Sequence, residues 1–226
     1  ADAYGRGLAE ATASAFEAGG GVIKNIVYHA PDATEFNSEV TAVGKGSPDA
    51  IVGILFPATG CGVLQPAFEQ GLLDTPWYMT DGVKDAGLAS LCNLGTALDG
   101  MKGTAPGSAA GEAFDAFSAA YAEVSADGAG TFIFAPQAYD AVMLMAISAA
   151  ANGVTGPEIA SGLVAASSGG EKCIGVACIE LAANGVDVDY VGASGEIELN
   201  EAGDPTAATY DICLLYTSDA ADDDRG

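Results

Sequence analysis

The stretch Trp77-Tyr78-Met79-Thr80-Asp81-Gly82 has the character of a short buried strand that ends abruptly in a carboxylate and a glycine. Aromatic and β-branched side chains favour strands, whereas Asp and Gly are turn residues. In an open α/β sheet, ligands bind beyond the carboxyl ends of the strands. Asp81 therefore stands where a ligand would meet the sheet. The ordinary alternative is that it is a turn residue or a helix N-cap.

Helix and strand patterns alternate around this stretch with short connections, a rhythm typical of a parallel sheet with right-handed crossovers. The pattern predicts helices over 3–18, from 32, and up to 70, and strands over 22–28, 50–56 and 101–104, with Pro57 to Gly60 as a loop. The first helix has no strand before it. We therefore expect the sequence to be a piece of a longer protein that lacks its N-terminal part.

After Ala105 the alternation of helix and strand patterns stops, and helical patterns dominate. Helices are expected from Ser108, over Pro136–Ala151, from Pro157 and over Val176–Ala183, with strands over 196–199 and 207–212. The helix over Pro136–Ala151 is apolar nearly all round, which is typical of a buried helix. We expect too few strands in this part for a sheet of its own.

Composition excludes several classes of partner. The 226 residues carry 7 Lys and Arg against 31 Asp and Glu, a net charge of −24. Nucleic-acid binding needs clustered cations, so a nucleic-acid partner is excluded, and an anionic membrane surface is disfavoured for the same reason. The longest apolar run, 141–151, is too short to cross a membrane. The glycines around Cys61 lack the lysine of a phosphate-binding loop, and no cofactor is predicted.

The C-terminal stretch 213–226 resembles the in-frame translation of a sequencing-library adaptor, and we expect it to be non-native. Without Cys213, four cysteines remain: Cys61, Cys92, Cys173 and Cys178. An even number, with no zinc-like cluster, permits disulfides and hence an extracytoplasmic location.

The predicted elements bring several candidate binding residues to the carboxyl edge of the sheet. Tyr4 and Phe56 would form an apolar wall. Asp81 would hold an ammonium group through charge-assisted hydrogen bonds. Thr59 begins the stretch Thr59-Gly60-Cys61-Gly62, which precedes a helix and whose N–H groups could receive an anion. One polar group per loop is also ordinary, and the alternative for Tyr4 and Phe56 is that they are plain core aromatics, which is the commoner role.

An enzyme remains a remote alternative. Cys61 and the only histidine, His29, could act as nucleophile and base of a cysteine hydrolase. However, the residues flanking Cys61 do not form a nucleophile elbow. We therefore predict that the chain is not an enzyme.

Eight short motifs occur in an order that resembles one family. They are 2–8 (DAYGRGL), 48–52 (PDAIV), 70–73 (QGLL), 80–82 (TDG), 103–107 (GTAPG), 137–142 (QAYDAV), 189–195 (DYVGASG) and 200–205 (NEAGDP). Together they resemble the branched-chain amino-acid (Leu/Ile/Val) binding proteins of ABC importers, which have the type I periplasmic binding fold. The resemblance covers nearly all of residues 1–212.

The resemblance implies an α/β fold with two Rossmann-like lobes and parallel sheets, the first lobe being incomplete. Residues 1–104 would form the second lobe, with 207–212 returning to it, and 105–206 would form the C-terminal part of the first lobe. The implied function is capture of an amino acid, a branched-chain one by preference, by closure of the lobes. Delivery to a membrane permease would follow, in the periplasm or outside the cytoplasm. The same fold used as a regulatory sensor of amides or amino acids is the alternative.

The resemblance also assigns residues. Tyr4, an aromatic near Phe56, and the acid Asp81 correspond to positions that contact the amino acid in the family. The acid is Asp here where some members have Glu, which shortens its reach. In an extracytoplasmic chain, Cys173 and Cys178 are predicted to form a disulfide across a short loop, while Cys61 and Cys92 stay unassigned.

Overall fold

The computed structural model describes residues 1–84, 87–125 and 134–214. The described residues form two compact units, one made of residues 1–105 together with 212–214, the other of residues 106–211. The boundaries fall between Ala105 and Pro106 and between Asp211 and Ile212. Each unit is built around its own core and is described by itself below.

The first unit alternates helices and strands, as its sequence predicts. In chain order its elements are α1 (Ala3–Ala18), α2 (Asn37–Val43), β1 (Ile51–Gly53), α3 (Pro57–Glu69), β2 (Trp77–Met79), α4 (Leu88–Leu91) and β3 (Lys102–Pro106), with 3₁₀ turns at Leu72–Asp74, Asp81–Val83 and Gly95–Leu98. β1 pairs with β2 and β2 with β3, both in parallel. The parallel sheet predicted from the alternating pattern is confirmed, and its strand order is β1-β2-β3-β7, with β7 spanning Tyr210–Leu214.

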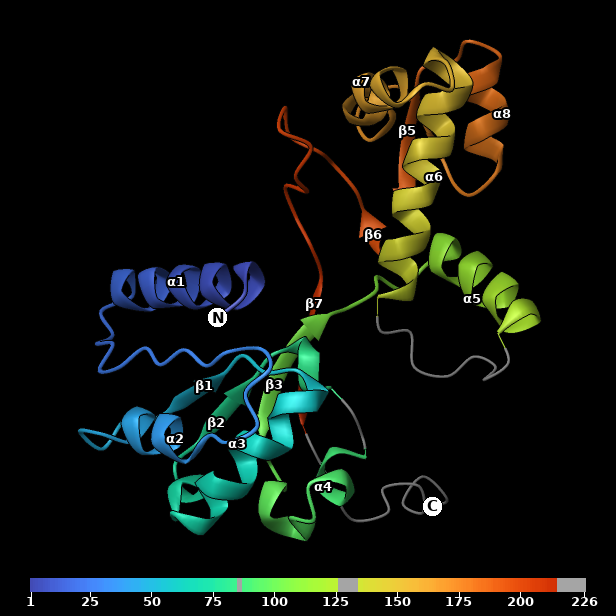
Figure 1. Ribbon diagram of the computed structural model, residues 1–226. Coiled ribbons are helices and arrows are strands. Elements are labelled where there is room, and N and C mark those ends of the chain that lie inside the picture. Colours follow the sequence, from blue (N-terminus) through green and yellow to red (C-terminus); the bar gives the residue numbers. More distant parts are fainter. Residues whose placement is uncertain (85–86, 126–133, 215–226) are drawn as a thin grey trace. The chain divides into compact units, whose positions relative to one another are not determined.

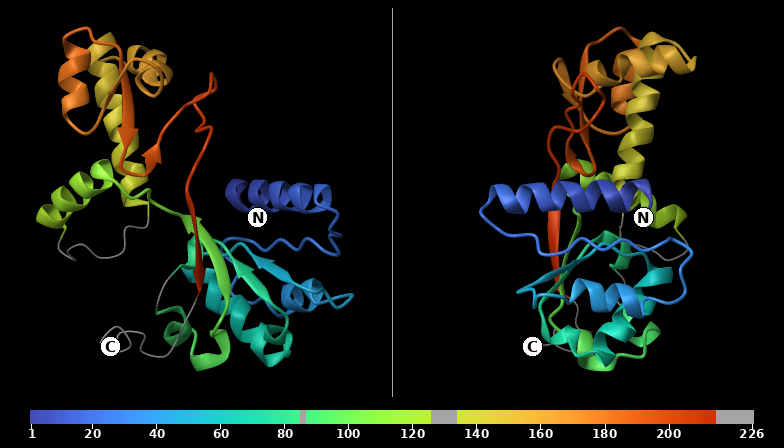
Figure 2. Two further views of the ribbon diagram at one scale, coloured as in Figure 1. Left: turned by 180° about the vertical axis from the view of Figure 1, so that it is seen from behind. Right: turned by 60° about the vertical axis from the view of Figure 1, so that its left-hand side comes forward.

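The core of this unit lies between the sheet and α3. Trp77 and Met79 of β2 are buried and pack in one cluster with Leu64 and Ala67 of α3. In Figures 1 and 2, α3 and α4 lie on one side of the sheet and α1 lies on the other. α1 matches its predicted bounds but buries none of its residues. The two sides of the sheet are therefore covered unequally.

Two strand predictions for the first unit are wrong. Residues 22–28 form no strand, although their side chains suit one. β1 is also shorter than the predicted 50–56, and its middle residue Val52 is half exposed. Both departures have one physical cause: β1 is the last strand of its sheet, and an extended segment becomes a strand only when a neighbour accepts its hydrogen bonds.

The predicted loop at Pro57 is instead the first turn of α3. Proline is favoured at that position because its ring presets the helical backbone and the missing N–H would have no partner there. Pro66 lies inside α3. The helix expected from Asp32 begins only at Asn37.

The second unit contains the helices α5 (Glu112–Val124), α6 (Ala135–Asn152), α7 (Gly156–Ala166) and α8 (Ala177–Ala183), and the strands β4 (Glu171–Cys173), β5 (Val188–Gly192) and β6 (Gly195–Glu196). The expectation that this part lacks a sheet of its own is wrong: the strand order is β4-β5-β6. β4 and β5 are parallel and β5 and β6 antiparallel, so the sheet is mixed. β4 has only three residues, two of them charged, so the sequence pattern gave no strand signal there.

A buried carboxylate organises the second unit. Asp140 of α6 is 2% exposed and accepts hydrogen bonds from the Tyr190 hydroxyl and the Ala193 N–H at 2.8 Å each. It also accepts from the N–H and the hydroxyl of Ser194, at 2.8 and 2.6 Å. These bonds tie the turn after β5 to α6. Burial, followed by the Asp140 charge, raises the pKa of the Tyr190 hydroxyl far above its usual value.

The C-terminal strand β7 extends two residues into the stretch 213–226 that is predicted to be non-native. β7 includes Cys213 and Leu214, which had been assigned to a non-native tail. The remainder of that tail, 215–226, and the predicted loop at 126–130 lie outside the described residues.

Candidate functional site

Tyr4 and Asp81 meet at the carboxyl edge of the first unit's sheet. Asp81 follows β2 directly and opens a 3₁₀ turn, while Tyr4 lies in the first turn of α1. The Tyr4 hydroxyl donates a hydrogen bond to Asp81 Oδ1 at 3.0 Å. Burial raises the pKa of the Tyr4 hydroxyl, and the nearby Asp81 carboxylate contributes to the rise. The phenol therefore stays protonated and remains a donor to the carboxylate.

Phe56 completes an aromatic wall beside this pair. It precedes α3 and its ring centroid lies 5.6 Å from that of Tyr4, with the planes inclined by 45°. Both side chains are still substantially exposed, Tyr4 at 39% and Phe56 at 45%. Three residues that are far apart in the sequence thus form one cluster with an apolar wall and a carboxylate, and we call it the Tyr4–Phe56–Asp81 cluster.

Thr59 has a different environment from the one expected. Its hydroxyl accepts from the Phe56 N–H at 3.4 Å and lies 3.3 Å from the Phe56 carbonyl oxygen, to which it donates. The residue is 5% exposed. Thr59 therefore caps α3 and fixes the backbone that carries Phe56, so its hydroxyl is occupied within the protein.

Two neighbours of Asp81, Thr80 and Gly82, contribute to the site but are not among the residues predicted from the sequence. The Thr80 hydroxyl oxygen is buried and has no well-aligned hydrogen-bond partner among the described residues, yet it lies close enough to the Tyr4 hydroxyl to lower its pKa. A side chain at Gly82 would collide with the carbonyl oxygen of Leu55. Glycine there lets the turn carrying Asp81 approach the loop carrying Phe56. The Asp-Gly pair was a signal for a turn, but not for this close approach.

The cysteine-hydrolase alternative is wrong. Cys61 is joined to Cys92 in a disulfide, so it has no free thiol to act as a nucleophile. His29 packs edge-on against Phe36, with ring centroids 5.1 Å apart. A second disulfide joins Cys173 to Cys178. Each unit therefore holds one disulfide within itself.

Within the described ranges, no group of three or more His, Cys, Asp or Glu side chains is arranged to hold a metal ion. In the same residues, no helix combines the length and the apolar character that a membrane crossing requires.

The chain belongs to the periplasmic binding protein family, whose model matches residues 1–174. This is a family of binding proteins and not of enzymes, in agreement with the prediction from the sequence, and the predicted α/β periplasmic binding fold is confirmed. None of the curated proteins compared with the chain matches it.

Solved structures of several solute-binding proteins share the fold. A leucine binding protein from Thermotoga maritima is 20% identical with a TM-score of 0.63 over 89% of this chain and 51% of its own. A branched-chain amino acid transporter substrate binding protein from Streptococcus pneumoniae, in complex with isoleucine, is 18% identical with a TM-score of 0.58 over 84% and 47%. A solute binding protein of an ABC transporter from R. palustris, in complex with 4-hydroxybenzoate, is 18% identical with a TM-score of 0.64 over 91% and 51%. The chain spans about half the length of these proteins.

Proposed function

We propose that this chain is part of an extracytoplasmic solute-binding protein that captures an amino acid and delivers it to an ABC importer. The observation that carries the proposal is the Tyr4–Phe56–Asp81 cluster. It places a carboxylate beside an exposed aromatic wall, at the sheet edge where α/β proteins bind their ligands. An ammonium group pairs with such a carboxylate, and an aliphatic side chain packs against the rings.

The charge of Asp81 favours an amino acid over a simple aromatic acid. One solved relative carries 4-hydroxybenzoate and another carries isoleucine. A benzoate brings a negative charge and no cation, so a carboxylate in the wall would repel it, whereas an α-amino acid brings an ammonium that needs a partner. We therefore favour a branched-chain amino acid as the ligand.

The disulfides support the location. The cytosol keeps thiols reduced, whereas the periplasm and the exterior allow disulfides to persist. Two disulfides in one chain, together with the family, favour the periplasm or another extracytoplasmic site. Recognition by a membrane permease and closure of two lobes on the ligand stay predictions from the family resemblance.

The proposal is tested by ligand-observed NMR, which detects weak binding. Saturation transferred from the protein should reach the methyl groups of leucine, isoleucine or valine, and isoleucine methyl ester, which keeps the ammonium, should compete. Benzoate and 4-hydroxybenzoate should show no competition at equal concentration. If the benzoates displace isoleucine, or if 3-methylpentanoate, which lacks the ammonium, binds as well as isoleucine, the amino-acid assignment is wrong.

A further inference from the structure

The Thr80 hydroxyl is a buried polar group at the carboxyl edge of the first unit's sheet. Thr80 follows β2 and precedes the 3₁₀ turn that Asp81 opens. Its backbone is fixed on both sides, since its N–H donates to the Gly53 carbonyl at 3.3 Å and its carbonyl accepts from the Val83 N–H at 3.3 Å. The backbone therefore holds the Thr80 side chain directly beside Asp81.

A threonine that precedes a helical turn usually caps it with its side chain, because the hydroxyl accepts from an N–H two or three residues later. The Thr80 hydroxyl makes no such bond. Its oxygen is nevertheless shielded from water and has no well-aligned partner among the described residues. Burying a hydroxyl is costly unless it finds a hydrogen-bond partner, so a partner other than the turn is expected.

The Tyr4 phenol can supply this partner. Its hydroxyl donates to Asp81 Oδ1 at 3.0 Å, and a phenol oxygen that has donated its only proton can still accept a hydrogen bond. Burial raises the pKa of the Tyr4 hydroxyl, and a hydrogen bond from Thr80 opposes the rise. A donor to the phenol oxygen acts in this direction, because it stabilises the phenolate. Thr80 is therefore the donor and the Tyr4 oxygen the acceptor.

We propose that Thr80 is a positioning residue of the ligand site: its hydroxyl donates to the Tyr4 oxygen and thereby directs the Tyr4 proton at Asp81 Oδ1. This inference rests on the proposed function, since it concerns the same cluster. A phenol proton lies in the plane of the ring and has two orientations, one on each side of the C–O bond. With the Thr80 donor on one side, the Tyr4 proton keeps to the side of Asp81.

The consequence for the ligand is a carboxylate that is held by one oxygen and open at the other. Tyr4 holds Oδ1 of Asp81, so the carboxylate does not turn freely, and Oδ2 is the acceptor for an ammonium group. The neutral phenol leaves the full negative charge of Asp81 for the ligand. Thr80 acts on the ligand through Tyr4 and does not touch it, because its oxygen is shielded.

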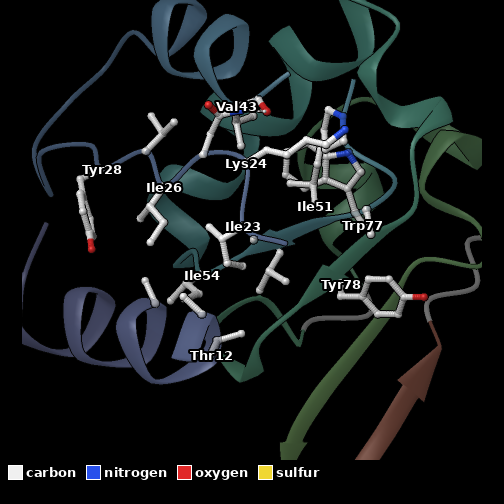
Figure 3. Close-up of a pocket in the computed structure, with 18 of the residues that line it drawn as sticks. Thr12, Ile23, Lys24, Ile26, Tyr28, Val43, Ile51, Ile54, Trp77 and Tyr78 are labelled. Atoms are coloured by element: carbon white, nitrogen blue, oxygen red, sulfur yellow. Dashed lines mark hydrogen bonds between the residues drawn. The ribbon is translucent and has the colours of Figure 1, made fainter. Parts of the chain in front are cut away.

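A groove of about 780 Å³ in the same unit has a different character. Figure 3 shows Ile23, Ile26 and Ile54 among the side chains around it. Its lining is mostly aliphatic and includes neither Thr80 nor any member of the Tyr4–Phe56–Asp81 cluster. A small polar ligand needs polar groups that converge on it, so the groove does not compete with the cluster for an amino acid.

The first test measures the Tyr4 pKa in the full 226-residue chain and needs no ligand. The tyrosines carry ¹³C at the ring carbon that bears the hydroxyl, and Tyr4→Phe identifies the Tyr4 signal. Thr80→Val keeps the shape of the side chain and removes the donor, so the Tyr4 pKa should rise. Thr80→Ser keeps the hydroxyl and should stay near the wild type, as should exposed Thr34→Val. An unchanged or lowered Tyr4 pKa in Thr80→Val would overturn the proposal.

The second test measures isoleucine binding by ligand-observed NMR titration. The net value of one hydrogen bond predicts about fivefold weaker binding by Thr80→Val, with Thr80→Ser close to the wild type. In a Tyr4→Phe background, Thr80→Val should have no further effect, because Thr80 acts through Tyr4. An equal loss in both backgrounds, or no loss in either, would overturn the positioning role.

The two tests separate this inference from the proposed function. If the wild-type chain binds no amino acid while Thr80→Val raises the Tyr4 pKa, the proposed function fails and Thr80 still directs the Tyr4 proton. If isoleucine binds and Thr80→Val changes neither the Tyr4 pKa nor the affinity, the proposed function stands and the role of Thr80 fails.

Discussion

Asp81 and Asp140 are both acids that face a strand end, yet they differ in burial and in the number of hydrogen bonds that they accept. Asp140 is 2% exposed and its two oxygens accept four hydrogen bonds, from Tyr190, Ala193 and Ser194. Asp81 is only partly buried, and its carboxylate accepts a hydrogen bond from the Tyr4 hydroxyl. A carboxylate whose acceptor sites are all filled stabilises a fold, whereas one with sites to spare can receive a ligand.

This comparison means that neither residue type nor position at a strand end separates a structural acid from a binding one. Both acids occur in motifs of the same family resemblance, Thr80-Asp81-Gly82 and Tyr139-Asp140-Ala141. The number of donors that surround each carboxylate makes the difference. Removing each acid in turn should therefore produce opposite results.

The largest expected effect is on ligand binding by Asp81→Ala. Removing one partner of a buried charged pair costs about 2–5 kcal/mol, which corresponds to a loss in affinity of roughly thirty-fold to a few thousand-fold. Asp81→Asn should do nearly as much harm, since it keeps the shape but loses the charge. Titration calorimetry with isoleucine measures the change.

Asp74→Ala is the matched control for this prediction, since Asp74 is an exposed acid in the same unit. It should bind as the wild type does. Asp81→Ala should leave the free energy of unfolding within about 0.5 kcal/mol of the wild type. An Asp81→Ala protein that binds its amino acid within about threefold of the wild type would make Asp81 a turn residue only.

Asp140→Ala should show the reverse pattern, a loss of stability and not of a binding contact. It leaves the Tyr190 hydroxyl and the N–H groups of Ala193 and Ser194 without their acceptor. Hydrogen bonds to a charged group contribute about 1.5–3 kcal/mol each, so the second unit should lose roughly 3 kcal/mol or more. Urea unfolding measures it, with exposed Asp115→Ala as the control. Equal midpoints for the two variants would contradict the structural role of Asp140.

The two disulfides are expected to stabilise the two units to different extents. Cys61 and Cys92 are 31 positions apart, and Cys173 and Cys178 are 5 apart. By chain entropy, closing these loops stabilises the folded state by about 3.5 and about 2 kcal/mol. Replacing each pair by serine should therefore destabilise the first unit more, by roughly 1.5 kcal/mol. Urea unfolding of the two double variants tests this, and a larger loss for the Cys173 and Cys178 pair would contradict it.

The smallest expected effect is a pH dependence from Tyr190. Its pKa is raised in the folded state by burial and by Asp140, while an unfolded tyrosine ionises near pH 10. The contribution to stability is thus fully present below about pH 10 and falls by roughly 1.4 kcal/mol per pH unit above it. Tyr190→Phe should flatten this slope, measured by urea unfolding between pH 8 and 11. Exposed Tyr210→Phe should not, and an unchanged slope in Tyr190→Phe would refute the assignment.

The sequence was sufficient where chemistry is local. The helix over 3–18 was predicted to the residue, because Asp2 caps its start and glycines end it. The parallel order of β1, β2 and β3 followed from the alternation of short strands and helices. Asp81, Tyr4 and Phe56 could be named as candidates because each ends a strand or opens a helix at one edge of such a sheet.

Contacts between distant residues could be known only from the tertiary structure. Residues 22–28 have the side chains of a strand, but a strand exists only when a neighbour accepts its hydrogen bonds, and among the described residues this segment pairs with no strand. Cys61 paired with Cys92 because folding brought α3 beside α4, which ended the nucleophile hypothesis. The sequence by itself determined which chemical groups are present and the local backbone that carries them. Only the fold decided that Asp140 is surrounded by donors while Asp81 keeps acceptor sites for a ligand. The reason is that each carboxylate meets partners that lie 50 or more positions away in the sequence.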